Sequence, residues 1–151
     1  MTQIRPLLDA VDLKALAILM QRGRTAWSEL AGALGMSPPA AAERVKRLEE
    51  RGAIRGFSAD VNHKSIGLDV LAFVKVTLVA SDPPDDFVQW VEQSRWVKEC
   101  HHVAGDCDYL LKLYCTDTGT LETVLTKELR RVPCVMNTCT TIVFSTVKDT
   151  S

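Results

Sequence analysis

Apolar residues in the first third of the chain recur at the spacing of α-helices, in three short segments. Residues 12–22 and 27–34 carry apolar side chains three or four positions apart, and a glycine follows each segment. The third segment, residues 37–52, starts with a serine that can cap a helix, followed by two prolines whose backbone is already close to helical. The pattern therefore predicts three helices.

Strand and helix patterns alternate in the rest of the chain. Residues 54–61 are predicted as a short strand and residues 62–69 as a hinge. One helix begins after Asp82, a good N-cap, and another carries apolar residues from Leu121 to Val132. Further strands are predicted over residues 70–79, 97–104, 109–115 and 138–147.

A tight turn joins the second and third of these strands. It reads Gly105-Asp106-Cys107-Asp108, and its glycine and aspartates suit a reversal of the chain. The resulting order, β-α-β-β-α-β, is the ferredoxin-like plan, an antiparallel four-stranded sheet with both helices on one face. Because the other face is left uncovered, we expect it to meet another subunit.

The second and third helices are separated only by Gly35 and Met36, so they must cross steeply, as in a helix-turn-helix. We expect a positive φ at Gly35. The predicted fold is therefore α+β: a winged helix-turn-helix domain over residues 1–61, the hinge over 62–69, and a ferredoxin-like domain over 70–151.

The third helix presents a charged outer face that suits the major groove of double-stranded DNA. Arg47 is the leading candidate for a base contact, and Glu43 could accept from a cytosine amino group. Trp27, on the second helix, is expected to pack rather than touch DNA. Alternatively, Glu43 and Arg47 only form an ion pair on a solvated face. The candidate DNA-binding residues, of which Arg44, Lys46 and Arg51 would meet phosphates, are Ser37, Pro38, Pro39, Ala40, Glu43, Arg44, Lys46, Arg47 and Arg51.

Composition and charge agree with this division. The 151 residues are 46% apolar and 25% charged, as in a soluble globular protein. Residues 1–64 hold ten cationic against seven acidic side chains, net +3, whereas the remainder holds eight against twelve, net −4. A basic first part suits a polyanion partner. With neither a membrane span nor a secretory signal in the sequence, the protein is expected in the cytoplasm, without a membrane partner.

The five cysteines are odd in number and lack the paired spacing of a zinc site. They are expected to be reduced and mostly buried. His101 and His102 could join Cys100 and Cys107 in a metal site, or Cys107 in a nucleophilic site, but neighbouring residues on a strand point to opposite faces. We therefore expect no metal, no catalytic residues and no enzymatic activity.

Motifs along nearly the whole chain, residues 8–148, resemble those of the Lrp/AsnC or feast/famine family, the leucine-responsive and asparagine regulators. They occur in the order and spacing of that family. The resemblance rests on Leu8 to Asp12, Glu29 to Ala31, Gly35 to Pro38, Glu43 to Glu49, Gly52 to Phe57, Gly105 to Leu111, Pro133 to Val135 and Thr138 to Val143.

This resemblance implies a transcription regulator that dimerises through its C-terminal sheets, often forms octamers, and binds a small amino acid, with no other cofactor, where subunits meet. An amide-rich turn can hold a carboxylate and an aspartate an ammonium group. Alternatively, these residues only shape the hairpin and strand, and the protein is an architectural DNA-binding protein without effector. Target genes, direction of regulation and effector identity stay open. The implied effector residues are Gly105, Asp106, Cys107, Asp108, Thr138 and Thr140.

Overall fold

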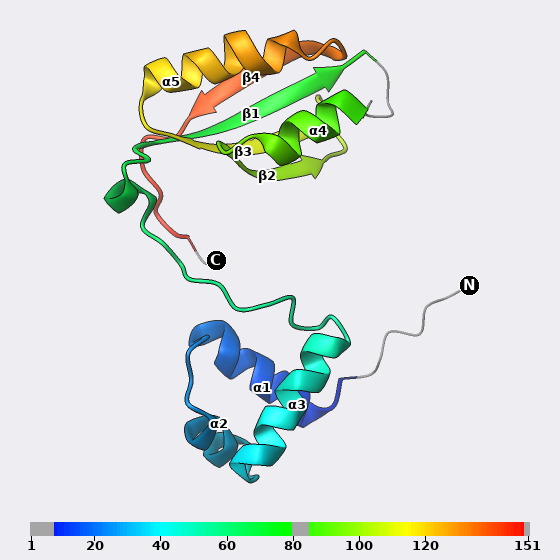
Figure 1. Ribbon diagram of the computed structural model, residues 1–151, viewed down its shortest axis with the longest axis vertical. Coiled ribbons are helices and arrows are strands. Elements are labelled where there is room, and N and C mark those ends of the chain that lie inside the picture. Colours follow the sequence, from blue (N-terminus) through cyan, green and yellow to red (C-terminus); the bar gives the residue numbers. More distant parts are fainter. Residues whose placement is uncertain (1–7, 80–84, 150–151) are drawn as a thin grey trace, which may run out of the picture. The chain divides into compact units, whose positions relative to one another are not determined.

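The computed structural model describes residues 8–79 and 85–149 (Figure 1). The chain divides into two compact units, Met1–Asp60 and Val61–Ser151, and each has its own hydrophobic core. Among the described residues, no helix is both long and apolar enough to cross a membrane.

The N-terminal unit contains the three predicted helices, α1 (Ala10–Gln21), α2 (Trp27–Leu34) and α3 (Pro38–Glu50). Gly35 ends α2 with a φ of 69°, the left-handed conformation expected from its glycine. The hydroxyl of Ser37 accepts a hydrogen bond from the Ala40 amide and caps α3, as predicted. The core between the helices consists of Ala15, Leu30, Ala31, Ala41, Val45, Leu48 and Ile54.

The prediction of a wing strand after α3 is wrong. Residues 54–61 form neither helix nor strand, and the described part of the N-terminal unit contains helices only. A strand requires a neighbour to hydrogen-bond with, and no strand of the described residues pairs with this segment. One apolar residue of this segment is nevertheless buried, because Ile54 packs in the core of this unit.

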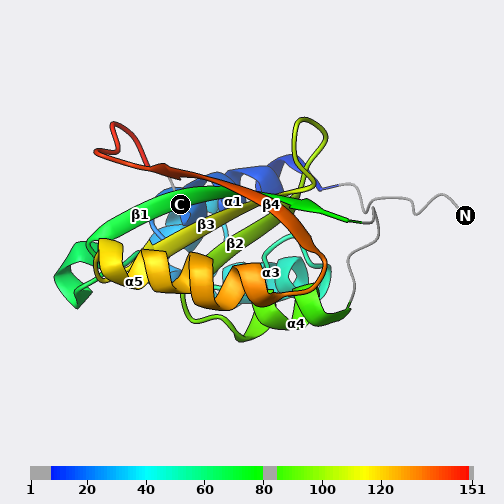
Figure 2. The same ribbon diagram turned by 90° about the horizontal axis from the view of Figure 1, so that it is seen from above.

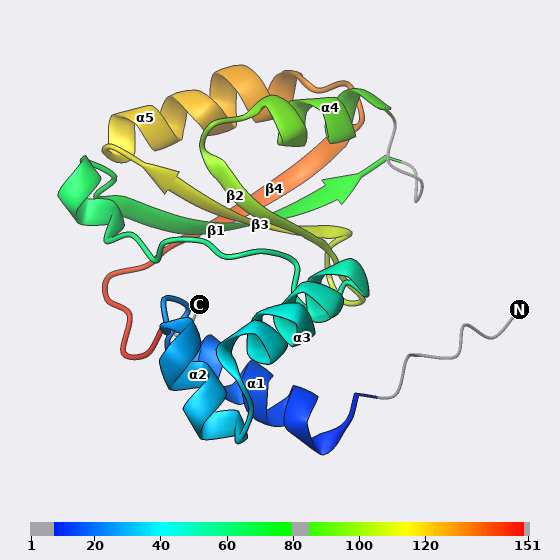
Figure 3. The ribbon, with the colours of Figure 1, turned by 60° about the horizontal axis from the view of Figure 1, so that its bottom comes forward.

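The C-terminal unit begins with a short 3₁₀ helix, His63–Ile66, and then follows the predicted β-α-β-β-α-β order. Its elements are β1 (Val70–Leu78), α4 (Asp85–Gln93), β2 (Val97–His102), β3 (Tyr109–Cys115), α5 (Thr118–Thr123) and β4 (Val135–Ile142). The antiparallel sheet has the order β2-β3-β1-β4, and both helices lie on one of its faces (Figure 3). The N-cap predicted at Asp82 lies outside the described residues.

Helix α5 continues without a break into a π-helical turn, Val124–Glu128, and a 3₁₀ turn, Leu129–Arg131. It packs through buried apolar residues on the sheet, together with Phe87 of α4. Within the described part of the C-terminal unit, neither α4 nor α5 covers the opposite face of the sheet (Figure 3). There the imidazole of His63 stacks on the ring of Tyr114, with ring centroids 3.7 Å apart.

Candidate DNA-binding and effector sites

The outer face of α3 is exposed, as a DNA-reading helix requires. Ser37, the two prolines and Ala40 at its start are exposed, as are the charged residues Glu43, Lys46, Arg47 and Arg51 further along. The ion pair between Glu43 and Arg47, considered from the sequence, does not form within the described residues. Lys46 instead lies 3.8 Å from Glu50, at an exposed position where such a pair contributes little.

Arg44 differs from the other candidates on α3. Its Nη1 atom lies 2.7 Å from Oδ2 of Asp9 and 2.5 Å from Oδ1 of Asp12. The two aspartates form a reciprocal capping box at the start of α1, and Asp12 is 4% exposed. The Arg44 guanidinium also holds the pKa of the Asp9 carboxyl below its ordinary value. Arg44 therefore ties α3 to α1, and these ion pairs leave its guanidinium less available to a phosphate than those of the exposed Arg47 and Arg51.

Trp27 does not pack as expected. It is 47% exposed at the first position of α2, beside an N-terminus that has no side-chain cap.

The turn between β2 and β3 projects beyond the strands (Figure 2). Gly105 does not have a positive φ, and a Cβ atom placed on it would meet no atom within 4 Å. The chain fold therefore does not require glycine at this position. Cys107 points into the fold, at 9% exposure.

The two aspartates of this turn have different partners. The carboxylate of Asp108 accepts a hydrogen bond from the Leu78 amide at 2.7 Å, at the irregular end of β1. Asp106 is exposed, and its carboxylate lies 2.7 Å from the Lys75 ammonium group, which holds the pKa of Asp106 below its ordinary value. Asp108 thus anchors the turn, whereas Asp106 stays accessible.

Thr138 and Thr140 lie at the opposite side of β1 from the turn. Thr138 is paired with Val76, a core residue, while Lys75, the partner of Asp106, is the next residue along β1. Neighbouring strand residues point to opposite faces, so Asp106 and Thr138 are on different faces of the sheet. One protomer therefore does not bring the predicted effector residues into a single pocket.

A shallow cavity of about 280 Å³ lies at the start of β4. It is lined by Arg130 together with Val135, Met136, Asn137 and Thr138. Lys75 and Arg130 were missed by the sequence reasoning, because neither belongs to a motif. In the structure, the side chain of Lys75 reaches Asp106, and Arg130 lines the same cavity as Thr138.

The histidines and cysteines form no common site. His101 is paired with Leu110 and its Nε2 lies 3.1 Å from Glu99, whereas His102 stacks on Tyr109. The two side chains thus face opposite sides, as predicted. The described cysteines are all free; Cys107 and Cys115 are buried, and Cys139 is exposed. No metal-binding group of His, Cys, Asp and Glu occurs within residues 8–79 and 85–149.

Two family models match the chain, and together they cover most of it. The AsnC-type helix-turn-helix domain matches residues 8–49, and the Lrp/AsnC ligand binding domain matches residues 71–151. Among curated relatives, the leucine-responsive regulatory protein of Haemophilus influenzae is 37% identical over 95% of this chain and 88% of its own. The proline dehydrogenase transcriptional activator of Rhizobium radiobacter is also 37% identical, over 95% and 93%.

Solved structures agree over the same length. A transcriptional regulator of Neisseria meningitidis in complex with L-methionine superposes with a TM-score of 0.90 at 29% identity, covering 96% of this chain and 95% of that one. A feast or famine regulatory protein of M. tuberculosis complexed with L-methionine gives 0.87 at 34% identity, covering 95% and 96%. Both the fold and the order of the two domains are therefore shared along nearly the whole chain.

Proposed function

The chain belongs to the Lrp/AsnC family of transcriptional regulators, and from this premise we propose that α3 reads DNA and that the turn at Gly105–Asp108 helps to hold a small amino acid. Its curated relatives are regulators rather than enzymes. The observation that supports DNA reading best is that Arg47 and Arg51 are exposed and form no ion pair among the described residues. We place this activity in the cytoplasm.

We assign the roles on α3 as follows. Arg47 reads a base, because its guanidinium can donate two hydrogen bonds to one guanine. Lys46 and Arg51 contact phosphates, and the exposed start of α3, from Ser37 to Ala40, approaches the backbone of the DNA. Glu43 faces the same groove and can accept from a cytosine amino group.

For the effector we propose a zwitterionic amino acid that inserts at the Lys75–Asp106 pair. Asp106 would accept its ammonium group and Lys75 would donate to its carboxylate, so the ligand would replace one ion pair by two. The open space above Gly105 allows a ligand to approach the backbone. Since Thr138, Thr140 and Arg130 lie on the other side, they would contribute from a neighbouring subunit.

Asp106→Ala is expected to abolish the response to the amino acid while leaving ligand-free DNA binding nearly unchanged. In the wild type, a typical allosteric coupling of about 1 to 3 kcal/mol changes DNA affinity by roughly 5- to 150-fold. The test is a titration of amino acids, L-methionine first, with DNA affinity and mass distribution both recorded. Glu92→Ala, which removes an exposed carboxylate from α4, is the matched control. A mutant that responds like the wild type rules out this site.

One observation favours a second candidate, an architectural DNA-binding protein without effector. Lys75 already neutralises Asp106 at 2.7 Å, so the turn offers no unpaired carboxylate to a ligand. If no amino acid at millimolar concentration changes either DNA affinity or mass distribution, this second candidate is preferred.

The second unit alone is expected to assemble at least to a dimer. Among the described residues, neither α4 nor α5 covers one face of its sheet. Leu71, Phe73 and Leu110 are only partly covered there, and apolar surface of this kind associates with a partner. Sedimentation of residues 61–151 at micromolar concentration checks this, and a monomer would contradict it. We also propose that full-length chains form higher oligomers, octamers among them.

A further inference from the structure

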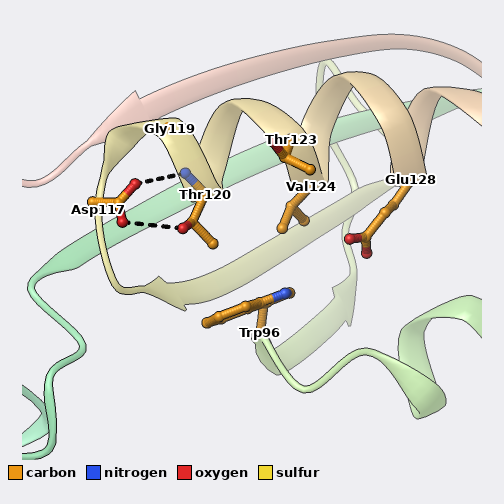
Figure 4. Close-up of a pocket in the computed structure, with 7 residues that line it drawn as sticks. All are labelled: Trp96, Asp117, Gly119, Thr120, Thr123, Val124 and Glu128. Atoms are coloured by element: carbon orange, nitrogen blue, oxygen red, sulfur yellow. Dashed lines mark hydrogen bonds between the residues drawn. The ribbon is translucent and has the colours of Figure 1, made fainter.

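A cavity separate from both candidate sites lies beneath α5, on the helical face of the sheet. Its volume is about 390 Å³, within the range of small-molecule sites. Trp96, just before β2, forms one wall, and α5 with its π-helical turn forms the other (Figure 4). Neither the residues of the β2–β3 turn nor those of β4 line it.

The helical wall repeats every four residues. Thr120, Val124 and Glu128 all line the cavity, and the side chains of Val124 and Glu128 extend toward the indole ring of Trp96 (Figure 4). The π-helical turn runs from Val124 to Glu128 and thus forms part of the wall itself. Such turns are rare and occur frequently at functional sites.

Negative charge stands at both ends of this wall. Asp117 accepts hydrogen bonds from the Thr120 amide at 2.7 Å and from the Thr116 hydroxyl at 3.0 Å, which lowers the pKa of its carboxyl. Glu128 is half-buried and makes neither a hydrogen bond nor an ion pair within the described residues. Burial, with added repulsion from Asp117 and Glu128, raises the pKa of the nearby Cys115 thiol to about 11.

An anionic ligand does not suit this cavity. None of its lining residues carries a positive charge, and the amide of Thr120 at the start of α5 is already bonded to Asp117. The indole of Trp96, in contrast, is a surface that attracts cations, and the Arg95 guanidinium already lies 4.4 Å from its ring centroid. Trp96 thus borders the cavity and also contacts Arg95, which does not itself line the cavity.

We propose that this cavity binds a small organic cation, a primary amine with a compact aliphatic body. The ammonium group would pair with Glu128, and the aliphatic part would lie between Val124 and Trp96. A free amino acid carries the same groups plus a carboxylate, which Asp117 and Glu128 would repel. The site would therefore distinguish an amine from the amino acid that yields it on decarboxylation. It does not depend on the effector site proposed above.

Calorimetric titration of the full-length protein with isoamylamine tests the proposal. We expect saturable binding of one molecule per chain, weakened by about tenfold or more in Glu128→Gln, because a charge-assisted hydrogen bond is lost. The matched control is Glu122→Gln, which removes an exposed carboxylate from the same helix outside the cavity and should leave the affinity unchanged. Circular dichroism of both variants checks that they are folded.

Two neutral or zwitterionic analogues complete the test. The alcohol 3-methylbutan-1-ol has the same body without the charge, and L-leucine adds the carboxylate. We expect the alcohol to bind at least about tenfold more weakly than the amine, and the heat of any L-leucine binding to be unaffected by Glu128→Gln. The proposal is overturned if isoamylamine does not bind at millimolar concentration, if both glutamate variants bind it like the wild type, or if the alcohol binds equally well.

Discussion

Asp12→Ala should destabilise the N-terminal unit by about 3 to 5 kcal/mol, the usual effect of removing one partner from a buried ion pair. Asp12 is 4% exposed, so its loss leaves the Arg44 guanidinium partly buried with only Asp9 as a partner. The mutation also removes one half of the capping box at the start of α1. DNA binding should fall with it, because Arg44 ties α1 to α3, the helix that we propose reads DNA.

Amide hydrogen exchange at Val45 and Leu48 measures this effect in the full-length protein. Both residues are buried in the core of the N-terminal unit, so their exchange reports its opening, and it should accelerate by roughly two to four orders of magnitude. Glu49→Ala, which removes an exposed carboxylate of α3, is the control. Equal exchange rates in the two variants would show that the Arg44 pair does not stabilise the fold.

The Asp9 carboxyl adds a pH dependence to the same contact. Its pKa is lower in the folded chain than the ordinary 3.8, mainly because Arg44 donates a hydrogen bond to it. A lowered folded-state pKa means that the stabilisation is fully present above the unfolded-state value. It is lost as the pH falls through the lower, folded-state pKa, so only strong acid should release this half of the contact.

Arg47→Ala should reduce discrimination between a selected DNA site and unrelated DNA by about 1 to 3 kcal/mol, the worth of one bidentate base contact. Lys46→Ala should instead weaken binding to all DNA similarly and reduce the dependence of log affinity on log salt by about one unit. The two residues are adjacent and both exposed, so each substitution serves as the control for the other. Fluorescence anisotropy on both DNAs at several salt concentrations separates the two effects. If neither substitution changes binding to the selected site, α3 is not the reader.

Local signals in the sequence were sufficient for the elements that depend on local chemistry. The serine and prolines at the start of α3 act through their own backbone and neighbours, so the cap appears where predicted. The β2–β3 turn forms at Gly105–Asp108 for the same reason. The alternation of strands and helices was enough to predict the sheet with both helices on one face.

The residues at which the strands begin and end could not be predicted from the sequence, because they depend on the neighbouring strand. The β-branched run was expected to make a strand over residues 138–147, but β4 is Val135–Ile142. It pairs only with β1, where Ile142 lies opposite Ala72 and Val143 makes the next backbone bond, to Leu71. Since β1 begins at Val70, residues beyond Val143 have no strand to join. The predicted strand over residues 54–61 does not form, because no strand of the described residues lies beside it to pair with.

The candidate sites were predicted unevenly for a similar reason. The sequence predicts a phosphate contact for Arg44, but the two aspartates that it binds lie more than thirty residues earlier in the sequence. Nothing in the sequence indicates that the start of α1 meets this helix. Likewise, Trp96 and Glu128 belong to no motif, and the cavity between them exists only because α5 packs on the sheet as it does.

The two units have separate interiors. The buried residues of the N-terminal core end at Ile54 and those of the C-terminal core begin at Ala72, with no residue in common. A substitution inside one core therefore leaves the packing of the other intact. During evolution, a chain built in this way could change the specificity of one unit while keeping that of the other. A chimera that joins the N-terminal unit of one relative to the C-terminal unit of another would test this independence in the laboratory.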